Sequence, residues 1–313
     1  MNRSPVVSLC LLTYNHSHTV EEAVQSILEQ DYRDYELIIS DDCSTDETWE
    51  IAREFESRHD QIRAVQTPQN LSMPGNANFA ASHARGKYIG LLHHDDIYRA
   101  DLLTRWVDVA ERHENVGFVF NEYNNVNRPH QRTHRAIGWD FSECMNGRGF
   151  LEDVLFGNRW GSPVRGTALV RRSCWEKVGG MREKFNLLAD VDLWMRLADR
   201  WDVGYVDEPV ITIRQARPSS YPTLYESGHF SWKRRRILHE IHKENVESHY
   251  RKRYEYNIYK AKLIVDVNTD ILWWSFYSIV KSKLSIAKEI SNKESGMELY
   301  PVRLFLRIIS VIK

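Results

Sequence analysis

Apolar runs alternate with stretches of helical periodicity along the N-terminal part of the chain. The runs predict buried strands at 6–12, 35–40, 62–66, 87–92 and 116–120. Between them, apolar residues recur at the i, i+3, i+4 and i+7 spacing of one helical face, which predicts helices at 20–28, 48–55, 76–84 and 102–113. Continuously apolar strands that alternate with helices are typical of an α/β fold, in which helices cover both faces of a mostly parallel sheet.

Polar clusters follow three of these predicted strands. The clusters are Thr13-Tyr14-Asn15, Asp41-Asp42 and His93-His94-Asp95-Asp96. Parallel strands place their carboxyl ends at one edge of the sheet, and ligands of such folds bind there. We therefore expect the three clusters to converge on one ligand site.

Asp95 and Asp96 are the carboxylates best suited to a metal. Paired carboxylates at a strand end are good ligands for Mg²⁺ or Mn²⁺, which can neutralise a diphosphate as it leaves. Asp is also common in solvated turns, so the pair alone is ambiguous. The two neighbouring polar clusters favour the metal site over the solvated turn.

The segment 41–46 suits the recognition of a nucleotide. The carboxylate of Asp42 can accept hydrogen bonds from a base N–H or a ribose hydroxyl, and Tyr14 can stack on a base, although it can equally be an ordinary packed tyrosine. Thr45 or Asp46 can cap the helix that follows. We expect Asp46 to cap that helix while Asp42 faces the ligand. Upstream, Thr19 and Glu22 have the spacing of a capping box.

The second half of the chain is less regular. It predicts a strand at 167–171, a short helix at 174–178 that ends at Gly179 and Gly180, and a longer helix at 190–200. Beyond about residue 225 the composition becomes basic and aromatic. We therefore expect a catalytic domain over 1–224 and a helical C-terminal extension over 225–313.

Five segments resemble, in order and spacing, the motifs of family 2 inverting glycosyltransferases. They are VSLCLLTYN at 7–15, ELIISDDCSTD at 36–46, KYIGLLHHDD at 87–96, KVGG at 177–180 and DVDLWMR at 190–196. The resemblance covers roughly residues 5–215. It implies the GT-A fold of the nucleotide-diphospho-sugar transferases, and a sugar donor linked to a nucleotide diphosphate, with UDP as the best guess.

The resemblance also implies roles for individual residues. Thr13, Tyr14 and Asp42 would contact the base and ribose, with Asn15, Asp41, Asn78 and His94 beside them in the donor site. Asp95 would hold the divalent metal, Mn²⁺ or Mg²⁺. Asp190 would act as the general base that deprotonates the acceptor hydroxyl, so that one displacement inverts the anomeric carbon. Asp190 could instead be a helix N-cap.

Three positions depart from the family pattern. His93 replaces the usual first Asp of the metal motif, and imidazole suits Mn²⁺ better than Mg²⁺. Ala77 stands where an Arg often contacts the diphosphate, so that the metal, or a residue such as Arg214 or Arg217, would have to neutralise its charge. Ala189 precedes the base where an acidic residue is common. These departures are the support for an inactive nucleotide-sugar-binding or scaffolding module.

Other enzyme classes lack their motifs in this chain. A sugar nucleotidyltransferase would need a Gly-rich, basic loop after the first strand, and a dehydrogenase would need Gly-x-Gly-x-x-Gly there. Residues 13–18 contain neither motif.

The distribution of charge limits which partners the protein can bind, and its use of cysteine indicates the cellular compartment. Residues 231–313 carry a net charge of +8, and residues 1–230 carry a net charge of −9. The acidic charge of residues 1–230 argues against nucleic acid as the main partner. The basic charge of residues 231–313 fits contact with an anionic membrane surface. A short amphipathic helix at 302–312 would suit such a contact, or could pack on its own domain.

Four cysteines without metal-ligand spacing, and no long apolar segment, predict a cytoplasmic protein that contacts the membrane peripherally. The expected acceptor is a glycan or a lipid-linked glycan.

Overall fold

A computed structural model of the chain describes residues 4–126, 140–156, 163–214 and 227–250. The chain divides into two compact units, Met1–Ala216 and Arg217–Lys313. The second unit contains helix α10 (Ser227–Tyr250) among the described residues. The expected boundary after residue 224 and the amphipathic helix at 302–312 lie outside the described residues, so both stay predictions.

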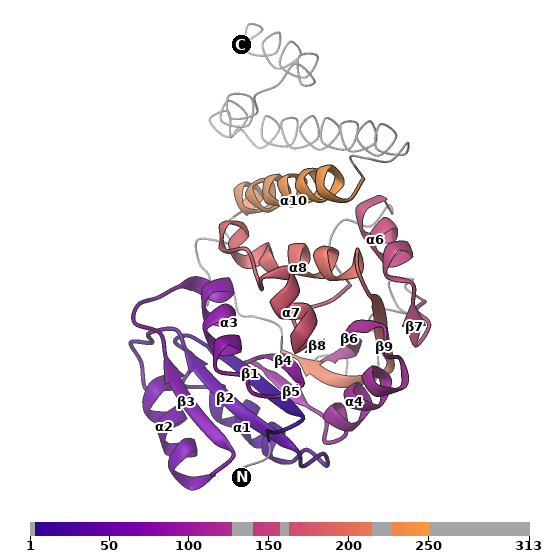
Figure 1. The fold of residues 1–313 in the computed structure, drawn as a ribbon. Coiled ribbons are helices and arrows are strands. Elements are labelled where there is room, and N and C mark those ends of the chain that lie inside the picture. Colours follow the sequence, from indigo (N-terminus) through magenta and orange to yellow (C-terminus); the bar gives the residue numbers. More distant parts are fainter. Residues whose placement is uncertain (1–3, 127–139, 157–162, 215–226, 251–313) are drawn as a thin grey trace, which may run out of the picture. The chain divides into compact units, whose positions relative to one another are not determined.

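One mixed sheet forms the centre of the first unit, with helices packed against it (Figure 1). Its strand order is β3-β2-β1-β4-β8-β6-β9-β5, and β7 also pairs with β9. The strands are β1 (Val7–Thr13), β2 (Tyr35–Asp41), β3 (Ile62–Gln66), β4 (Tyr88–His93), β5 (Asp96–Tyr98), β6 (Val116–Asn125), β7 (Cys144–Met145), β8 (Ala168–Arg171) and β9 (Asp202–Ile213). The pairs β1–β2, β2–β3, β1–β4 and β6–β9 are parallel, whereas β8 runs antiparallel to both of its neighbours. The predicted α/β class with a mostly parallel sheet is confirmed.

The helices follow the predicted positions closely. They are α1 (Val20–Leu28), α2 (Thr48–Arg58), α3 (Ser72–Ser82), α4 (Leu102–Arg112), α6 (Gly147–Phe156), α7 (Arg172–Val178) and α8 (Ala189–Ala198), with a 3₁₀ helix η1 (Glu183–Leu188) before α8. Helix α3 begins four residues earlier than expected because Pro74 lies in its first turn, where no backbone N–H is needed. The predicted capping box of α1 is wrong, since Thr19 is the N-cap but forms no side-chain capping bond.

Strands β1 and β2 are buried along their whole lengths, as their continuous apolar runs predict. The Cys10 thiol lies buried in β1, and burial together with the charge of Glu36 raises its pKa to about 12. All four cysteines are free.

Strand β9 was not predicted from the sequence, and neither were β5, β7 and α6. In β9 the polar residues Asp207 and Glu208 interrupt an otherwise apolar segment, and Pro209 follows them. The pairing with β6 shifts register on both sides of Glu122, opposite this interruption. A period-2 pattern that is broken in this way gives no clear strand signal, because a bulge turns the following side chains to the other face.

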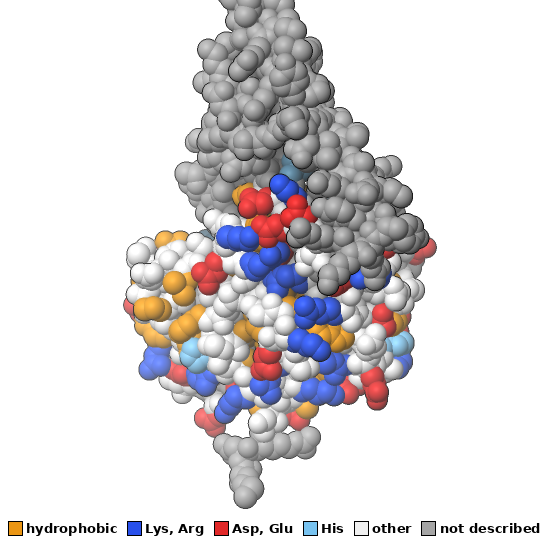
Figure 2. Space-filling model, turned by 45° about the horizontal axis from the view of Figure 1, so that its top comes forward, with side chains coloured by type: hydrophobic (Ala, Val, Ile, Leu, Met, Phe, Trp, Pro, Cys, Tyr) orange, Lys and Arg blue, Asp and Glu red, His pale blue; other side chains and the backbone are white. Residues whose placement is uncertain are grey.

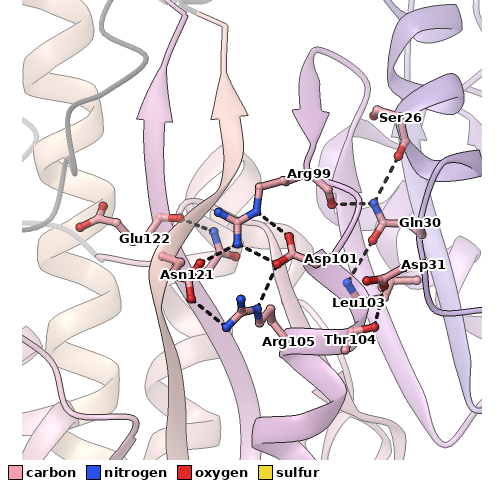
Figure 3. A network of polar contacts seen from close by, with 11 residues as sticks. Ser26, Gln30, Asp31, Arg99, Asp101, Leu103, Thr104, Arg105, Asn121 and Glu122 are labelled. Atoms are coloured by element: carbon pink, nitrogen blue, oxygen red, sulfur yellow. Dashed lines mark hydrogen bonds and ion pairs between the residues drawn. The ribbon is translucent and has the colours of Figure 1, made fainter.

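A polar network fixes the segment that follows β5 (Figure 3). Arg99 donates hydrogen bonds to Asp101 (2.8 Å) and Glu208 (2.7 Å), and Arg105 bonds to the same two carboxylates at 3.0 and 2.7 Å. The hydrogen bond from Arg99 is the main cause of the lowered pKa of Asp101. Because these side chains are partly exposed, each pair contributes little free energy, but together they connect the start of α4 to β9.

Figure 2 shows one face of the molecule, on which the described Lys and Arg side chains lie interspersed with Asp and Glu. Mixed charge of this kind creates no strong field of one sign. The acidic excess of residues 1–230 is therefore not gathered on this face. Within the described part of the chain, no helix has the length and apolarity needed to cross a bilayer.

Two glycines of α6 provide a matched test of the packing of this helix. A Cβ on Gly147 would lie 1.8 Å from the carbonyl oxygen of Trp201, whereas a Cβ on Gly149 would meet nothing within 4 Å. We expect Gly147→Ala to lower the free energy of unfolding by about 1–3 kcal/mol, because the two backbones must move apart. Gly149→Ala should be neutral or stabilise by up to about 1 kcal/mol, since Ala favours helix. Denaturant titration of both variants measures this, and equal effects would contradict the described contact.

Candidate active site

The three polar clusters lie at one edge of the sheet. Thr13 at the end of β1 pairs with Asp41 at the end of β2, and Leu12 pairs with His93 at the end of β4. The parallel direction of these strands brings the three clusters together, as the sequence predicts.

Asn15 ties the first cluster to the second. Its backbone N–H donates to the Ser44 hydroxyl at 2.8 Å, and its side-chain oxygen accepts from the Thr45 backbone N–H at 2.7 Å. Asn15 has a φ of 54°, in the left-handed region that Asn tolerates better than most residues. The adjacent Tyr14 is 40% exposed, so its ring can be reached by a ligand above the loop.

Asp41 and Asp42 use their carboxylates to hold the loops around them. Asp41 is fully buried and accepts from the Ser44 backbone N–H (3.0 Å) and from the Gln66 amide (2.9 Å). Asp42 is 3% exposed and accepts from the Leu71 backbone N–H at 2.8 Å. Burial raises the pKa of Asp42 in spite of its hydrogen bonds. In this structure the Asp42 carboxylate is directed toward the loop at 67–72, and its expected contact with a ligand stays a prediction.

The N-cap of the following helix is Glu47, so the prediction that Asp46 caps this helix is wrong, but Asp46 still binds the start of the helix. Its carboxylate accepts from the backbone N–H of Thr48, the first residue of α2, at 3.0 Å. The same carboxylate also accepts from the Ser17 backbone N–H at 3.1 Å. This single side chain thus joins α2 to the loop after β1.

His94 and Thr13 lie below the surface of the site. The Nδ1 atom of His94 is 2.9 Å from the carbonyl oxygen of Leu12, and its ring lies 3.5 Å from that of His16, centroid to centroid. Burial and the neighbouring His16 lower the pKa of His94 to about 4, so the ring is neutral at pH 7. The hydroxyl of Thr13 is buried and has no hydrogen-bond partner among the described residues.

Asp95 differs from the other carboxylates of this edge. It follows β4 directly and is half-buried, and none of the described residues forms a hydrogen bond or ion pair with it. The next residue, Asp96, is buried, and burial together with the charge of Asp95 raises its pKa. Asp95 is therefore the carboxylate of this pair that is available to an incoming group.

Gly166 brings Asp190 next to the end of β4. Gly166 has a φ of +80°, and a Cβ at this position would lie 2.6 Å from His93 Nε2 and 3.5 Å from Asp190 Oδ2. Asp190 is the second residue of α8, and the N-cap is Leu188. The alternative that Asp190 is an N-cap is therefore wrong, and its carboxylate and the His93 ring both flank Gly166.

Asp192 has a structural role at the start of α8. It is fully buried and pairs with Arg182 (2.8 Å) and Arg196 (2.8 Å). Burial would raise its pKa, but the hydrogen bond from Arg182 and the charges of both arginines lower it below the usual value. Arg196 also donates to the carbonyl oxygens of Val178 and Gly180, so this network holds the turn after α7.

Asn78 fastens the same turn. Its amide donates to the Met181 carbonyl oxygen at 2.9 Å, and its side-chain oxygen accepts from the Met181 backbone N–H at 2.9 Å. Asn78 makes this structural contact, and its expected place in the donor site stays a prediction. Ala77 and Ala189 are completely buried, so neither position leaves room for the longer side chain of the family pattern.

Two residues that contribute to the site were missed from the sequence. Gly166 is a lone glycine before a strand, and His16 is one polar residue of a loop. Neither residue belongs to a motif whose spacing indicates a function. Of the two arginines expected to help with the diphosphate, Arg214 forms an ion pair with Glu22, and Arg217 lies outside the described residues.

Comparison with known proteins identifies the family. The family model of glycosyl transferase family 2 matches residues 8–179, which is more than half of the chain. EpsE of Bacillus subtilis, which is named as a glycosyltransferase, is 29% identical over 226 residues, covering 69% of this chain and 75% of EpsE. The Escherichia coli UDP-Glc:alpha-D-GlcNAc-diphosphoundecaprenol beta-1,3-glucosyltransferase WfgD is 30% identical over 122 residues, which is 39% of this chain and 47% of WfgD.

The fold agrees with this assignment. The structure of residues 1–349 of S. aureus TarS in complex with UDP-GlcNAc aligns with a TM-score of 0.56 at 14% identity, covering 91% of this chain and 90% of that one. The predicted GT-A fold is thus confirmed. The chain belongs to glycosyl transferase family 2.

Proposed function

We propose that the chain transfers a sugar from a nucleotide-diphospho-sugar, with UDP as the first choice of nucleotide, to an acceptor hydroxyl with inversion of the anomeric carbon. The observation that carries this proposal is that Asp190 and His93 both flank Gly166. This supports a base near the end of β4, which Asp95 follows closely.

The nucleotide would bind over the loops after β1 and β2. The exposed ring of Tyr14 can stack on the base. Asn15, Asp41 and Asp42 hold these loops in place, and backbone groups of the same loops can take up the ribose. TarS was crystallised with UDP-GlcNAc, and WfgD is named for UDP-Glc, which supports a UDP-linked donor here.

The site fits a divalent cation that is shared with the donor. Among the described residues no group of three or more His, Cys, Asp and Glu side chains could hold a metal by itself. Mg²⁺ and Mn²⁺ are commonly bound by one or two carboxylates together with substrate phosphates, and the Asp95 carboxylate forms no hydrogen bond or ion pair with any described residue. Such a cation would neutralise the charge that develops on the leaving diphosphate.

Asp190 would remove the proton from the acceptor hydroxyl. The acceptor oxygen then attacks the anomeric carbon from the face opposite the diphosphate, the bond from that carbon to the phosphate oxygen breaks, and the nucleoside diphosphate leaves. A single displacement of this kind inverts the anomeric centre. The position of Asp190 at the start of α8, held by the network of Asp192, Arg182 and Arg196, keeps the base in place.

We further propose a role in the synthesis of a cell-surface polysaccharide, with a glycan or lipid-linked glycan as acceptor, because WfgD is named for a diphosphoundecaprenol acceptor. The net charge of +8 in residues 231–313 supports peripheral contact with the anionic cytoplasmic face of a membrane.

The metal proposal is tested at Asp95. Asp95→Ala should remove the Mn²⁺-dependent part of UDP affinity, because the carboxylate that would hold the cation is lost. Isothermal titration of UDP with and without Mn²⁺ measures this for both proteins. Asp101→Ala, at the surface network of Figure 3, is the control and should bind UDP normally. Equal Mn²⁺ dependence in native protein and Asp95→Ala would refute the assignment.

The base proposal is tested with the carboxylates of α8. Asp190→Asn should keep UDP affinity and folding but lower kcat by about 10²–10⁴, the usual contribution of a positioned general base. Asp192→Asn should lower the free energy of unfolding by about 3 kcal/mol, because two arginines lose a buried partner. Turnover with a UDP-sugar panel and denaturant titration separate the two effects. Normal turnover of Asp190→Asn with a dead but stable Asp192→Asn would show that the wrong carboxylate has been chosen.

A further inference from the structure

A small hollow lies beside the end of β4, on the side of the sheet that holds β6 and β9. The space within it is about 10 Å³, enough for about one water molecule, so a larger group can lie only over its mouth. The polar side chains that line it are Asp96, Asn121, Tyr123, Arg165 and Thr167, and apolar side chains of β6 and β9 complete the lining.

Arg165 is the cationic group of this hollow. Its side chain is exposed, and its guanidinium lies over the Tyr123 ring, 5.5 Å from the centroid. No carboxylate among the described residues forms an ion pair with it. Its charge still acts on both His93 and Asp96, so Arg165 lies next to the end of β4. An oriented guanidinium without an anionic partner, beside a candidate catalytic centre, is suited to bind an anion.

The order of the strands tells which substrate would meet Arg165. The nucleotide loops follow β1 and β2, which lie on one side of β4, whereas β8, β6 and β9 lie on the other side. Asp190 lies at the boundary, where Gly166 precedes β8. In an inverting displacement the acceptor approaches from the face opposite the diphosphate, so the acceptor is the substrate that lies over β8, β6 and β9.

We propose that Arg165, positioned by Tyr123, determines specificity in an acceptor subsite for a sugar that carries an anionic group, a carboxylate or a phosphate. The proposal rests on the proposed function. The planar guanidinium can donate two parallel hydrogen bonds to either anion. The Tyr123 ring beneath the guanidinium restricts its orientation before the anion binds, so that binding costs less side-chain entropy. The buried hydroxyl of Thr167, which has no hydrogen-bond partner among the described residues, adds a polar group to the same hollow.

The test uses three small acceptor probes on the full chain saturated with UDP and Mn²⁺. The probes are methyl β-glucuronide, glucose 6-phosphate and methyl β-glucoside, and NMR titration gives their Kd values. The native protein should bind at least one anionic probe about tenfold more tightly than the glucoside, as a charge-assisted hydrogen bond provides. Arg165→Gln should remove this difference and leave the Kd of the glucoside and of UDP unchanged. Arg165→Lys should keep part of it, because the charge remains but the two parallel bonds do not.

Arg53→Gln is the matched control, since Arg53 is an exposed arginine of α2 that pairs only with Glu56. It should keep the preference for the anionic probe. The glucuronide and the phosphate separate the two kinds of anion, and an Arg165-dependent preference for either supports the subsite. Equal or absent binding of all three probes would overturn it, and so would a loss of UDP affinity in Arg165→Gln, which would place Arg165 on the donor diphosphate. A native protein that fails to bind UDP with Mn²⁺ would instead refute the proposed function.

Discussion

The left-handed backbone at Gly166 is the constraint on which the candidate site depends. At φ +80° a residue with a Cβ would be strained, and the Cβ would also lie 2.6 Å from the His93 ring. Only a glycine lets the segment before β8 pass between the end of β4 and the start of α8. The proposed metal ligand Asp95 and the proposed base Asp190 can therefore lie near each other, although they are about a hundred residues apart in the chain.

The carboxylates around this junction divide into two groups. Asp41, Asp42, Asp46 and Asp192 accept hydrogen bonds from backbone or arginine donors and hold loops and helices in place. Asp95 makes no such bond. A carboxylate whose bonds are satisfied within the fold is a poor ligand for a substrate, because its protein partners would have to be given up. Residue type and position at a strand end do not separate these groups; the hydrogen-bond partners do.

Much of the architecture could be predicted because it depends on local pattern. The apolar runs that became β1 to β4, and the helical periodicity of α1 and α4, are signals carried within a few residues. Strand β9 was missed because Asp207 and Glu208 interrupt its apolar pattern, and the fold accommodates them as a shift of register opposite Glu122. Similarly, Pro74 suggested a loop but lies in the first turn of α3. In these cases the pairing partner or the position within the helix decided the outcome, and neither is visible along the sequence.

The sequence by itself determined the α/β class, the meeting of three strand ends and the motifs of family 2, since these follow from residue periodicity and order. Only the tertiary structure decided which side chains are available there. It directed Asp42 toward a loop, fastened Asn78 to Met181 and left Asp95 without a partner. It also placed Arg165 beside a hollow between strands from distant parts of the chain. Such juxtapositions arise from the order of strands in the sheet, and strand order is set by long-range packing, which no local pattern encodes.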